Sequence, residues 1–396
     1  MKIAIIVPGR FHAFDLAREL LKLGHDVTLF TNYPKFAVAR FGVRPDKVRS
    51  FLIHGILSRF FQALQRKCGF PYPEKLMHSV FGKWAMVRVC CEPWDVVQGW
   101  SGICEDLFNQ LKDSTAVLVC ERGSTHISFQ RKILEEEVRR IDRSLEVPSE
   151  WTVNREIREY DLADVVHVPS RFAKESFARE GFPEDKVKVV LLGVESKKFR
   201  SLPAHAQERY DRILSGRSLR ILNVGTFNFR KGVWDTAAVV RELAPEGFHF
   251  RFVGSVAFEA RGLALELRSL AEFIDKIPQY ELVEQYAWAD LFILPTLEEG
   301  FPMVSLQAAA SGLPILTTPN GAGFDLVRDS VTGWVLPPRN PKSFTEKLKW
   351  CHVHRKELAN MAMRTYSDFR PRDWSKVADD FIEACKESEA LKKEKK

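Results

Sequence analysis

The chain has 396 residues, of which 45% are hydrophobic and 28% are charged. This length suggests two domains, and this composition is typical of a globular protein, which excludes wholesale disorder, a collagen-like chain and a multi-span membrane protein. The formal net charge of +7 is too small to indicate nucleic-acid binding by itself.

The seven cysteines are too few for a disulfide scaffold, and no Cys-x-x-Cys occurs, so we expect neither structural zinc nor a dithiol redox centre. Scattered thiols fit a reducing compartment. The apolar run at residues 3–7 ends at Pro8 and is too short for a signal peptide. No run reaches the roughly 18 apolar residues of a membrane span. We therefore expect a cytoplasmic protein.

The first half of the chain alternates short apolar runs with one clear amphipathic stretch. Residues 2–7 and 27–30 read as buried parallel strands, with a helix from Asp15 to Leu23 between them. Further strands are predicted at 96–97, 116–119, 165–168 and 187–190. Strand–helix–strand units of this kind predict a doubly wound α/β domain.

Residues 35–89 are unusually basic, with eleven Lys and Arg but only two acidic residues. Aromatic and aliphatic residues are interleaved with the basic ones in this segment and are densest from Phe51 to Leu64. Two interpretations stay open. The segment is either a helix pair with a solvated basic face, or it contacts an anionic ligand or the anionic inner face of a membrane.

The second half repeats the pattern of the first. Strands are predicted at 220–224, 249–253, 291–294 and 314–316, and a helix from Val233 to Leu243. Residues 196–218 are polar and basic without a clear period, so we interpret them as an interdomain linker. A second doubly wound domain follows, and residues 374–384 have the apolar pattern of a terminal helix.

The stretch from Leu291 to Pro314 carries the most chemical information. A predicted strand ends at Pro295, a loop contains Glu298 and Glu299, and a helix is predicted from Met303 to Ala310. Free N–H groups and the dipole at a helix N-terminus favour a phosphate group. We therefore place a phosphate at Gly300, Phe301 and Pro302, with Glu299 near sugar hydroxyls and Gln307 near a ribose. Glu298 is interpreted as a neighbouring surface carboxylate.

This stretch resembles the donor-site signature of retaining GT-B glycosyltransferases of family 4, the glycosyl transferases group 1. In that family a Glu is followed by a second Glu eight positions later, and here Gln307 replaces the second. The loop GTFNFRKG at 225–232 is similar to the family's Gly-Arg-Leu…Lys-Gly loop. Lys231 matches the family's diphosphate-binding lysine. Thr226 occupies the position where the family usually has an arginine, and Arg230 lies next to Lys231.

The resemblance covers most of the chain. It implies an α/β, GT-B fold with two doubly wound Rossmann-like domains facing across a cleft and a C-terminal helix crossing back to the first domain. The acceptor-binding domain would comprise residues 1–200 with helix 371–390, and the donor-binding domain residues 201–370. The blocks that carry the resemblance beyond the donor loop are found at 168–172, 186–195, 286–290, 317–338 and 370–374.

In the first domain, ligands should bind at the carboxyl ends of the parallel strands. Gly9 closes the first strand–helix turn, and Arg10 and His12 follow it, so we predict that these three residues bind the acceptor. His126 follows the strand at 116–119. The family often has a His in this loop near the donor sugar, and the resemblance therefore implies a catalytic role for His126.

The resemblance implies transfer of a sugar from a nucleotide-diphospho-sugar to a glycan or lipid-linked acceptor, in cell-surface polysaccharide or lipopolysaccharide biosynthesis. Lys231, Arg230 and the helix N-terminus would neutralise the leaving diphosphate without a metal or other cofactor. Catalytic roles fall to His126, Glu299 and Lys231. In the family the donor phosphate is thought to accept the acceptor's proton on the same face.

Two other functions remain open. Thr226 and Gln307 depart from the family pattern, which fits a sugar-nucleotide binding protein without catalysis. A dinucleotide-dependent oxidoreductase also has Rossmann-like domains, but neither Gly9 nor Gly225 opens the Gly-x-Gly-x-x-Gly fingerprint that such an enzyme requires.

Overall fold

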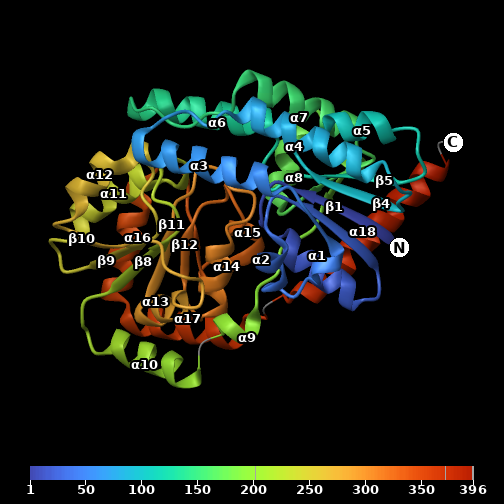
Figure 1. The fold of residues 1–396 in the computed structure, drawn as a ribbon. Helices are drawn as coiled ribbons and strands as arrows, with labels where there is room; N and C mark the ends of the chain where they lie inside the picture. Colours follow the sequence, from blue (N-terminus) through green and yellow to red (C-terminus); the bar gives the residue numbers. More distant parts are fainter. Residues whose placement is uncertain (201, 371, 395–396) are drawn as a thin grey trace. The chain divides into compact units, whose positions relative to one another are not determined.

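The computed structural model describes residues 1–200, 202–370 and 372–394. These residues form two compact units (Figure 1). Unit 1 comprises Met1–Arg131, Val147–Gly193 and the C-terminal segment from Trp374, and unit 2 comprises Lys132–Glu146 and Val194–Asp373. The predicted boundary residues Ser201 and Pro371 lie outside the described residues.

Unit 1 contains a seven-stranded sheet of order β3-β2-β1-β4-β5-β6-β7 in which every neighbouring pair is parallel. Its strands are β1 (Lys2–Val7), β2 (Asp26–Thr31), β3 (Val48–Ser50), β4 (Val96–Trp100), β5 (Val117–Glu121), β6 (Val165–Val168) and β7 (Val187–Val189). The chain order reverses between β1 and β4, where a doubly wound sheet binds its ligands.

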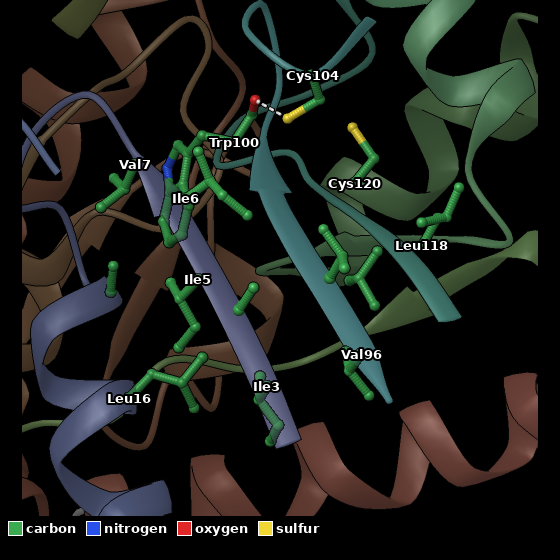
Figure 2. Close-up of a cluster of buried hydrophobic side chains, with 14 of the residues drawn as sticks. Ile3, Ile5, Ile6, Val7, Leu16, Val96, Trp100, Cys104, Leu118 and Cys120 are labelled. Carbon is green, nitrogen blue, oxygen red and sulfur yellow. Dashed lines mark hydrogen bonds between the residues drawn. The ribbon is translucent and has the colours of Figure 1, made fainter. Parts of the chain in front are cut away.

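The strands of unit 1 form because their continuous apolar runs can be buried on both faces of the sheet. Figure 2 shows part of this core, which includes Ile3 and Ile5 of β1, Val96 of β4 and Leu118 of β5. The thiol of Cys104 donates a hydrogen bond to the carbonyl of Trp100 at 3.0 Å (Figure 2).

Helices cover the sheet of unit 1. They are α1 (Ala13–Lys22), α2 (Lys35–Ala39), α3 (Leu52–Cys68), α4 (Glu74–Val89), α5 (Glu105–Leu111), α7 (Glu150–Leu162), α8 (Arg171–Arg179) and α18 (Trp374–Glu394), with single 3₁₀ turns at Pro45–Lys47 and Glu184–Lys186. The C-terminal helix α18 lies beside α1 and against β5, and its Val377, Phe381 and Cys385 are buried. Helix α6 (Ile127–Ile141) begins in unit 1, and its residues from Lys132 onward belong to unit 2.

Unit 2 contains a six-stranded parallel sheet of order β10-β9-β8-β11-β12-β13. Its strands are β8 (Arg220–Val224), β9 (His249–Val253), β10 (Ala271–Ile274), β11 (Leu291–Leu294), β12 (Ile315–Thr317) and β13 (Gly333–Val335). Its helices are α9 (Ser196–Phe199), α10 (Pro203–Leu214), α11 (Val233–Leu243), α12 (Arg261–Leu267), α13 (Leu282–Trp288), α14 (Met303–Ala310), α15 (Gly323–Leu326), α16 (Pro341–Val353) and α17 (Arg355–Asp368), with 3₁₀ turns at Phe229–Lys231 and Phe258–Ala260. The prediction of two doubly wound α/β domains is confirmed.

The interpretation of residues 196–218 as an irregular linker is wrong over most of its length. Residues Pro203–Leu214 form helix α10, which packs against α17 and α13. Its buried positions are Ala206, Arg209 and Ile213, which follow the helical period. The Arg209 guanidinium, buried completely, donates hydrogen bonds to the carbonyls of Tyr286, Ala289, Ser311 and Gly312. These four bonds stabilise the buried charge.

Candidate functional site

In unit 2, two strand–helix turns meet at the carboxyl ends of β8 and β9. Gly225 has φ +130° and Gly254 has φ +146°, a backbone region that side chains other than glycine rarely adopt. A Cβ added to Gly254 would lie 2.1 Å from the Gly225 carbonyl oxygen. The two turns therefore approach each other closely because both positions lack a side chain. The hydroxyls of Thr226 and Ser255 lie 3.4 Å apart in the same turns.

Lys231 lies at the end of the turn that follows β8. The side chain of Asn228 accepts a hydrogen bond from the Lys231 backbone N–H at 3.1 Å, which closes the 3₁₀ turn Phe229–Lys231. The aliphatic part of the lysine runs past Gly225, where an added Cβ would lie 3.4 Å from its Cε. The turn thereby fixes where the ammonium group is held.

The cations of this turn pair with two buried carboxylates from the loop after β11. Lys231 Nζ lies 2.5 Å from Glu299 Oε1, and the Arg230 guanidinium lies 3.2 Å from Glu298 Oε2 and 3.3 Å from Glu299 Oε1. Glu298 is fully buried, so its interpretation as a surface carboxylate is wrong. The reason is Arg230, whose charge and hydrogen bond offset the cost of burying the carboxylate.

The loop after β11 leads into α14. Its residues Gly300, Phe301 and Pro302 are buried, and Pro302 is the residue before the first helical turn. Gln307 lies one turn further on, where its Oε1 accepts a hydrogen bond from the Tyr286 hydroxyl at 3.0 Å. The hydroxyl of Ser305, also buried, has no hydrogen-bond partner among the described residues. Unit 2 thus brings together Lys231, Arg230 and Glu299 at one end of its sheet.

In unit 1, the predicted residues Gly9, Arg10 and His12 lie in the turn between β1 and α1. Arg10 lies over the Phe41 ring, 4.0 Å from its centroid, and pairs with Asp15 at 3.6 Å. His12 Nε2 lies 3.0 Å from Oε1 of Glu121, the last residue of β5. The carboxyl ends of β1 and β5 therefore hold a histidine–carboxylate pair beside the point where the strand order reverses.

His126 also lies in unit 1, whereas Lys231 and Glu299 lie in unit 2. Its backbone N–H donates to Ser176 Oγ at 2.8 Å, and its Nδ1 accepts from the Ser128 N–H at 3.2 Å. Its ring packs against Tyr160 and Phe177, with centroids 5.2 and 4.9 Å away. This surrounding holds the ring firmly, and the catalytic role of His126 stays a prediction.

Sequence reasoning missed Glu121, Gln98 and the burial of Glu298. Gln98 of β4 donates a hydrogen bond to Glu121 Oε2 at 2.7 Å. A usable signal existed for Glu121, because it comes two residues after the strand predicted at 116–119, and neighbouring parallel strands end at the same edge of a sheet. Within the described residues, no three His, Cys, Asp or Glu side chains are grouped so that they could hold a metal ion. Among those residues no helix is long and apolar enough to cross a bilayer.

Residues 218–352 match the model of the family described as Glycosyl transferases group 1. WcaL of Escherichia coli, provisionally named a colanic acid biosynthesis glycosyltransferase, is 25% identical over 46% of this chain and 47% of its own length. The amylovoran biosynthesis glycosyltransferase AmsK of Erwinia amylovora is 27% identical over 42% of this chain and 42% of its own. The chain thus spans less than half the length of these relatives.

Solved structures share the fold over nearly the whole chain. HepE of Anabaena, solved with UDP and glucose, superposes with a TM-score of 0.66 at 14% identity, covering 98% of this chain and 100% of that one. Sucrose-phosphate synthase from Thermosynechococcus elongatus gives a TM-score of 0.70 at 18% identity, covering 99% and 100%. Residues 218–352 are thus similar to the group 1 glycosyl transferases, and the chain shares its two-domain α/β architecture, the GT-B fold, with these solved structures.

Proposed function

We propose that the protein transfers a sugar from a nucleotide-diphospho-sugar to a glycan or lipid-linked acceptor, in the synthesis of a cell-surface polysaccharide or lipopolysaccharide. The observation that carries the proposal is the cluster of Arg230, Lys231 and Glu299 at the carboxyl ends of β8 and β11. HepE, solved with UDP and with UDP-glucose, supports the nucleotide-sugar donor. The biosynthetic names of WcaL and AmsK support the polysaccharide setting.

The chemistry follows from the charges of the cluster. As the bond between the anomeric carbon and the phosphate oxygen breaks, negative charge grows on the departing diphosphate. Lys231, Arg230 and the N-terminus of α14 supply positive charge to that group, so the proposal requires no metal ion or other cofactor. In the structure, Glu298 and Glu299 balance the two cations. A bound diphosphate would take over part of the interaction that Lys231 makes with Glu299. The Glu299 carboxylate could then accept hydrogen bonds from the sugar hydroxyls. Retention of the anomeric configuration is the outcome that the resemblance to family 4 favours.

The test is a thermal-shift screen against UDP-, GDP- and ADP-linked sugars, since a ligand that binds only the native state raises its stability. The donor found in this way then enters a transfer assay with the Lys231→Ala variant. We expect nucleotide binding and transfer to be lost in Lys231→Ala and kept in Lys342→Ala, which removes an exposed lysine of the same unit. Full activity of Lys231→Ala would refute the site, and binding without transfer to any acceptor would identify a non-catalytic binder.

We also propose that α3 and α4 of unit 1 contact an anionic membrane surface, where a lipid-linked acceptor would be found. Ile53 and Ile56 of α3 are 69% and 66% exposed, and Phe60, one turn further along, is also exposed. Leu76, Val80 and Val87 of α4 are exposed as well. Basic residues flank these apolar side chains and provide the charge complementarity to anionic lipids; they are Arg59, Arg66, Lys67, Lys75, Lys83 and Arg88.

Sedimentation with vesicles tests this surface. We expect the intact protein to pellet with phosphatidylglycerol-containing vesicles at low salt and much less with purely zwitterionic ones. The double variant Ile53→Gln/Ile56→Gln should lose most of this binding. The matched control is Leu265→Gln/Val353→Gln in unit 2, whose side chains are 70% and 74% exposed, and it should bind like the wild type. Equal binding by both double variants would refute the surface.

A further inference from the structure

A wide hollow lies at the amino ends of three neighbouring strands of unit 2. Arg220, His249 and Ala271 line it, and they are the first residues of β8, β9 and β10 (Figure 1). The proposed donor site lies at the carboxyl ends of β8 and β11, so the hollow is at the opposite edge of the same sheet. Its volume is about 800 Å³, within the range of about 300–1,000 Å³ that is usual for small-molecule sites. The hollow is therefore large enough to hold a ligand of its own.

Basic side chains share one face of these strands. Arg220 of β8 is in register with His249 of β9, and Arg251 follows His249 by two positions. Because successive side chains of a strand point to opposite faces, these three residues lie on the same face. Phe250 points to the other face and into the core of unit 2. The hollow thus has a cationic wall in a parallel sheet, which is otherwise usually buried under apolar side chains on both faces.

Trp288, the last residue of α13, holds two of the arginines close together. Cζ of Arg251 lies 3.7 Å from the centroid of the Trp288 ring, and Cζ of Arg220 lies 5.5 Å from it. Arg251 also donates to Glu272 Oε2 at 2.7 Å and to Gln285 Oε1 at 2.9 Å. Arg220 donates to the Trp288 carbonyl at 3.4 Å, and its Nε and Nη2 have no hydrogen-bond partner among the described residues. Both guanidinium groups are therefore oriented before a ligand arrives, and Arg220 retains donors for it.

Positive charge is in excess around the hollow. Its lining contains three arginines and one carboxylate, which are Arg220, Arg251, Arg268 and Glu272. Neither Arg220 nor Arg268 forms an ion pair within the described part of the chain. The nearby carboxylate of Asp290 is already paired with Arg212 at 2.6 Å. Burial lowers the pKa of Arg220, and the positive charge of Arg212 lowers it further. A bound anion would offset this repulsion between like charges.

We propose that this hollow binds the phosphate group of a small phosphorylated molecule. Guanidinium groups match phosphate oxygens with paired N–H donors, and a phosphate dianion brings more charge and more oxygens to several arginines than a carboxylate does. Pro245 and Leu270 also line the hollow and offer an apolar surface to the carbon skeleton of the ligand. The Glu272 side chain is 52% exposed, so it can turn to solvent when phosphate takes its place on Arg251. This inference does not depend on the proposed glycosyl transfer.

The experiment is calorimetry of the full chain at low salt with inorganic phosphate, glucose 6-phosphate and acetate. We expect saturable binding of both phosphates, tighter for the ester because its carbon skeleton covers the apolar surface, and about tenfold weaker binding of acetate. Arg220→Gln and Arg251→Gln should each weaken phosphate binding about tenfold or more, because each removes hydrogen bonds to a charged group. Glu272→Gln should strengthen it, because it removes the carboxylate that competes for Arg251. Arg328→Gln, which changes an exposed arginine elsewhere in unit 2, is the matched control and should bind like the wild type.

Three outcomes of the calorimetry would contradict the proposal. The absence of saturable phosphate binding, or equal binding by wild type and Arg220→Gln, overturns the site. Weaker phosphate binding by Glu272→Gln overturns the competition for Arg251. An ester that binds no more tightly than inorganic phosphate overturns the role of the apolar surface.

Arginine labelling gives a readout that needs no variant. Phenylglyoxal modifies accessible arginines, and the modified positions are found by peptide mass spectrometry. Glucose 6-phosphate should slow the modification of Arg220 and Arg268 in the wild type and leave that of Arg328 unchanged. Equal modification rates of Arg220 with and without the ester overturn the inference.

The two sites of unit 2 are separated by their own variants. Lys231→Ala should keep phosphate binding in the hollow, whereas Arg220→Gln should keep the binding of the nucleotide sugar. If the wild type binds phosphate in the hollow but no nucleotide sugar, the proposed function fails and the hollow stands. If nucleotide sugar binds and Arg220 is not protected from labelling, only the hollow fails.

Discussion

Gly232 joins the turn that carries Lys231 to helix α11, and its replacement by alanine should damage the proposed donor site in a measurable way. Gly232 has φ +72°, and a Cβ there would lie 1.9 Å from the Pro295 carbonyl oxygen and 2.7 Å from the carbonyl carbon. In protein structures a Cβ atom essentially never lies within 3.0 Å of an atom to which it is not bonded or adjacent in the chain. One of the two loops that hold Lys231 and Glu299 must therefore move by about 1 Å in Gly232→Ala.

Two energy terms act at this position, and a second glycine separates them. A left-handed conformation costs alanine about 1–2 kcal/mol, and forcing an atom into a packed region costs about 1–3 kcal/mol more. Gly216 has φ +73°, and nothing lies within 4 Å of a Cβ built there. Gly216→Ala therefore carries the conformational term alone. We expect Gly232→Ala to lower the free energy of unfolding of unit 2 by about 2–5 kcal/mol and Gly216→Ala by about 1–2 kcal/mol.

The assay is urea unfolding followed by tryptophan fluorescence, with nucleotide affinity measured on the same preparations. Trp234, two residues after Gly232, reports on unit 2. Gly232→Ala should weaken nucleotide binding because Lys231 shifts with the loop, whereas Gly216→Ala should not. Equal destabilisation by the two variants, or unchanged nucleotide affinity in Gly232→Ala, would show that the two loops are not in rigid contact.

Three further changes test single interactions. Glu299→Gln removes the carboxylate that balances Lys231, so a free nucleotide diphosphate should bind about fivefold more tightly while transfer falls, and weaker nucleotide binding in calorimetry would contradict this. Arg209→Ala removes one hydrogen-bond donor from each of four backbone carbonyls, of which that of Ala289 keeps Arg212 as a second donor, and should cost about 3–5 kcal/mol in urea unfolding, against less than about 0.5 kcal/mol for the exposed Arg241. Burial lowers the pKa of His167 from 6.5 to about 4, so the native state stays neutral while the unfolded chain binds a proton. The wild type should lose up to about 3 kcal/mol of stability as the pH falls from 6.5 to 4, and His167→Leu should lose less; parallel pH–stability curves would rule this out.

Helices and strands that are marked by a short run of neighbouring residues could be predicted from the sequence. The strands at 220–224, 249–253 and 291–294 are continuous apolar runs between turn residues, and the structure places them at those bounds. The helix at 303–310 begins after a proline and ends before glycine, and it too has the predicted bounds. Helix α10 was missed because Arg209 occupies a buried position of its period, and a charged residue normally indicates a solvent-facing position.

The pairs that make up the sites could not be predicted because their partners are far apart in the sequence. Glu298 is separated from Arg230 by 68 residues, and Glu121 from His12 by 109. The order and register of the parallel strands decide which strand ends lie side by side, and residue patterns within one strand do not contain that information. Lys231 and Glu299 were proposed individually from a resemblance, and their 2.5 Å contact depends on β8 and β11 being neighbours.

The two sites use buried carboxylates in the same physical way. Glu121 accepts a hydrogen bond from His12 and one from Gln98, and Glu299 accepts hydrogen bonds from Lys231 and Arg230. A buried carboxylate without a partner is costly, so each of these groups stabilises the fold only while its partner is present. Lys231 and His12 are therefore also structural requirements of their own units. A substitution that removes only the cation, such as Lys231→Ala, should destabilise unit 2 more than one that removes both partners, such as Lys231→Met with Glu299→Leu, because the first leaves the buried Glu299 with Arg230, 3.3 Å away, as its remaining cation.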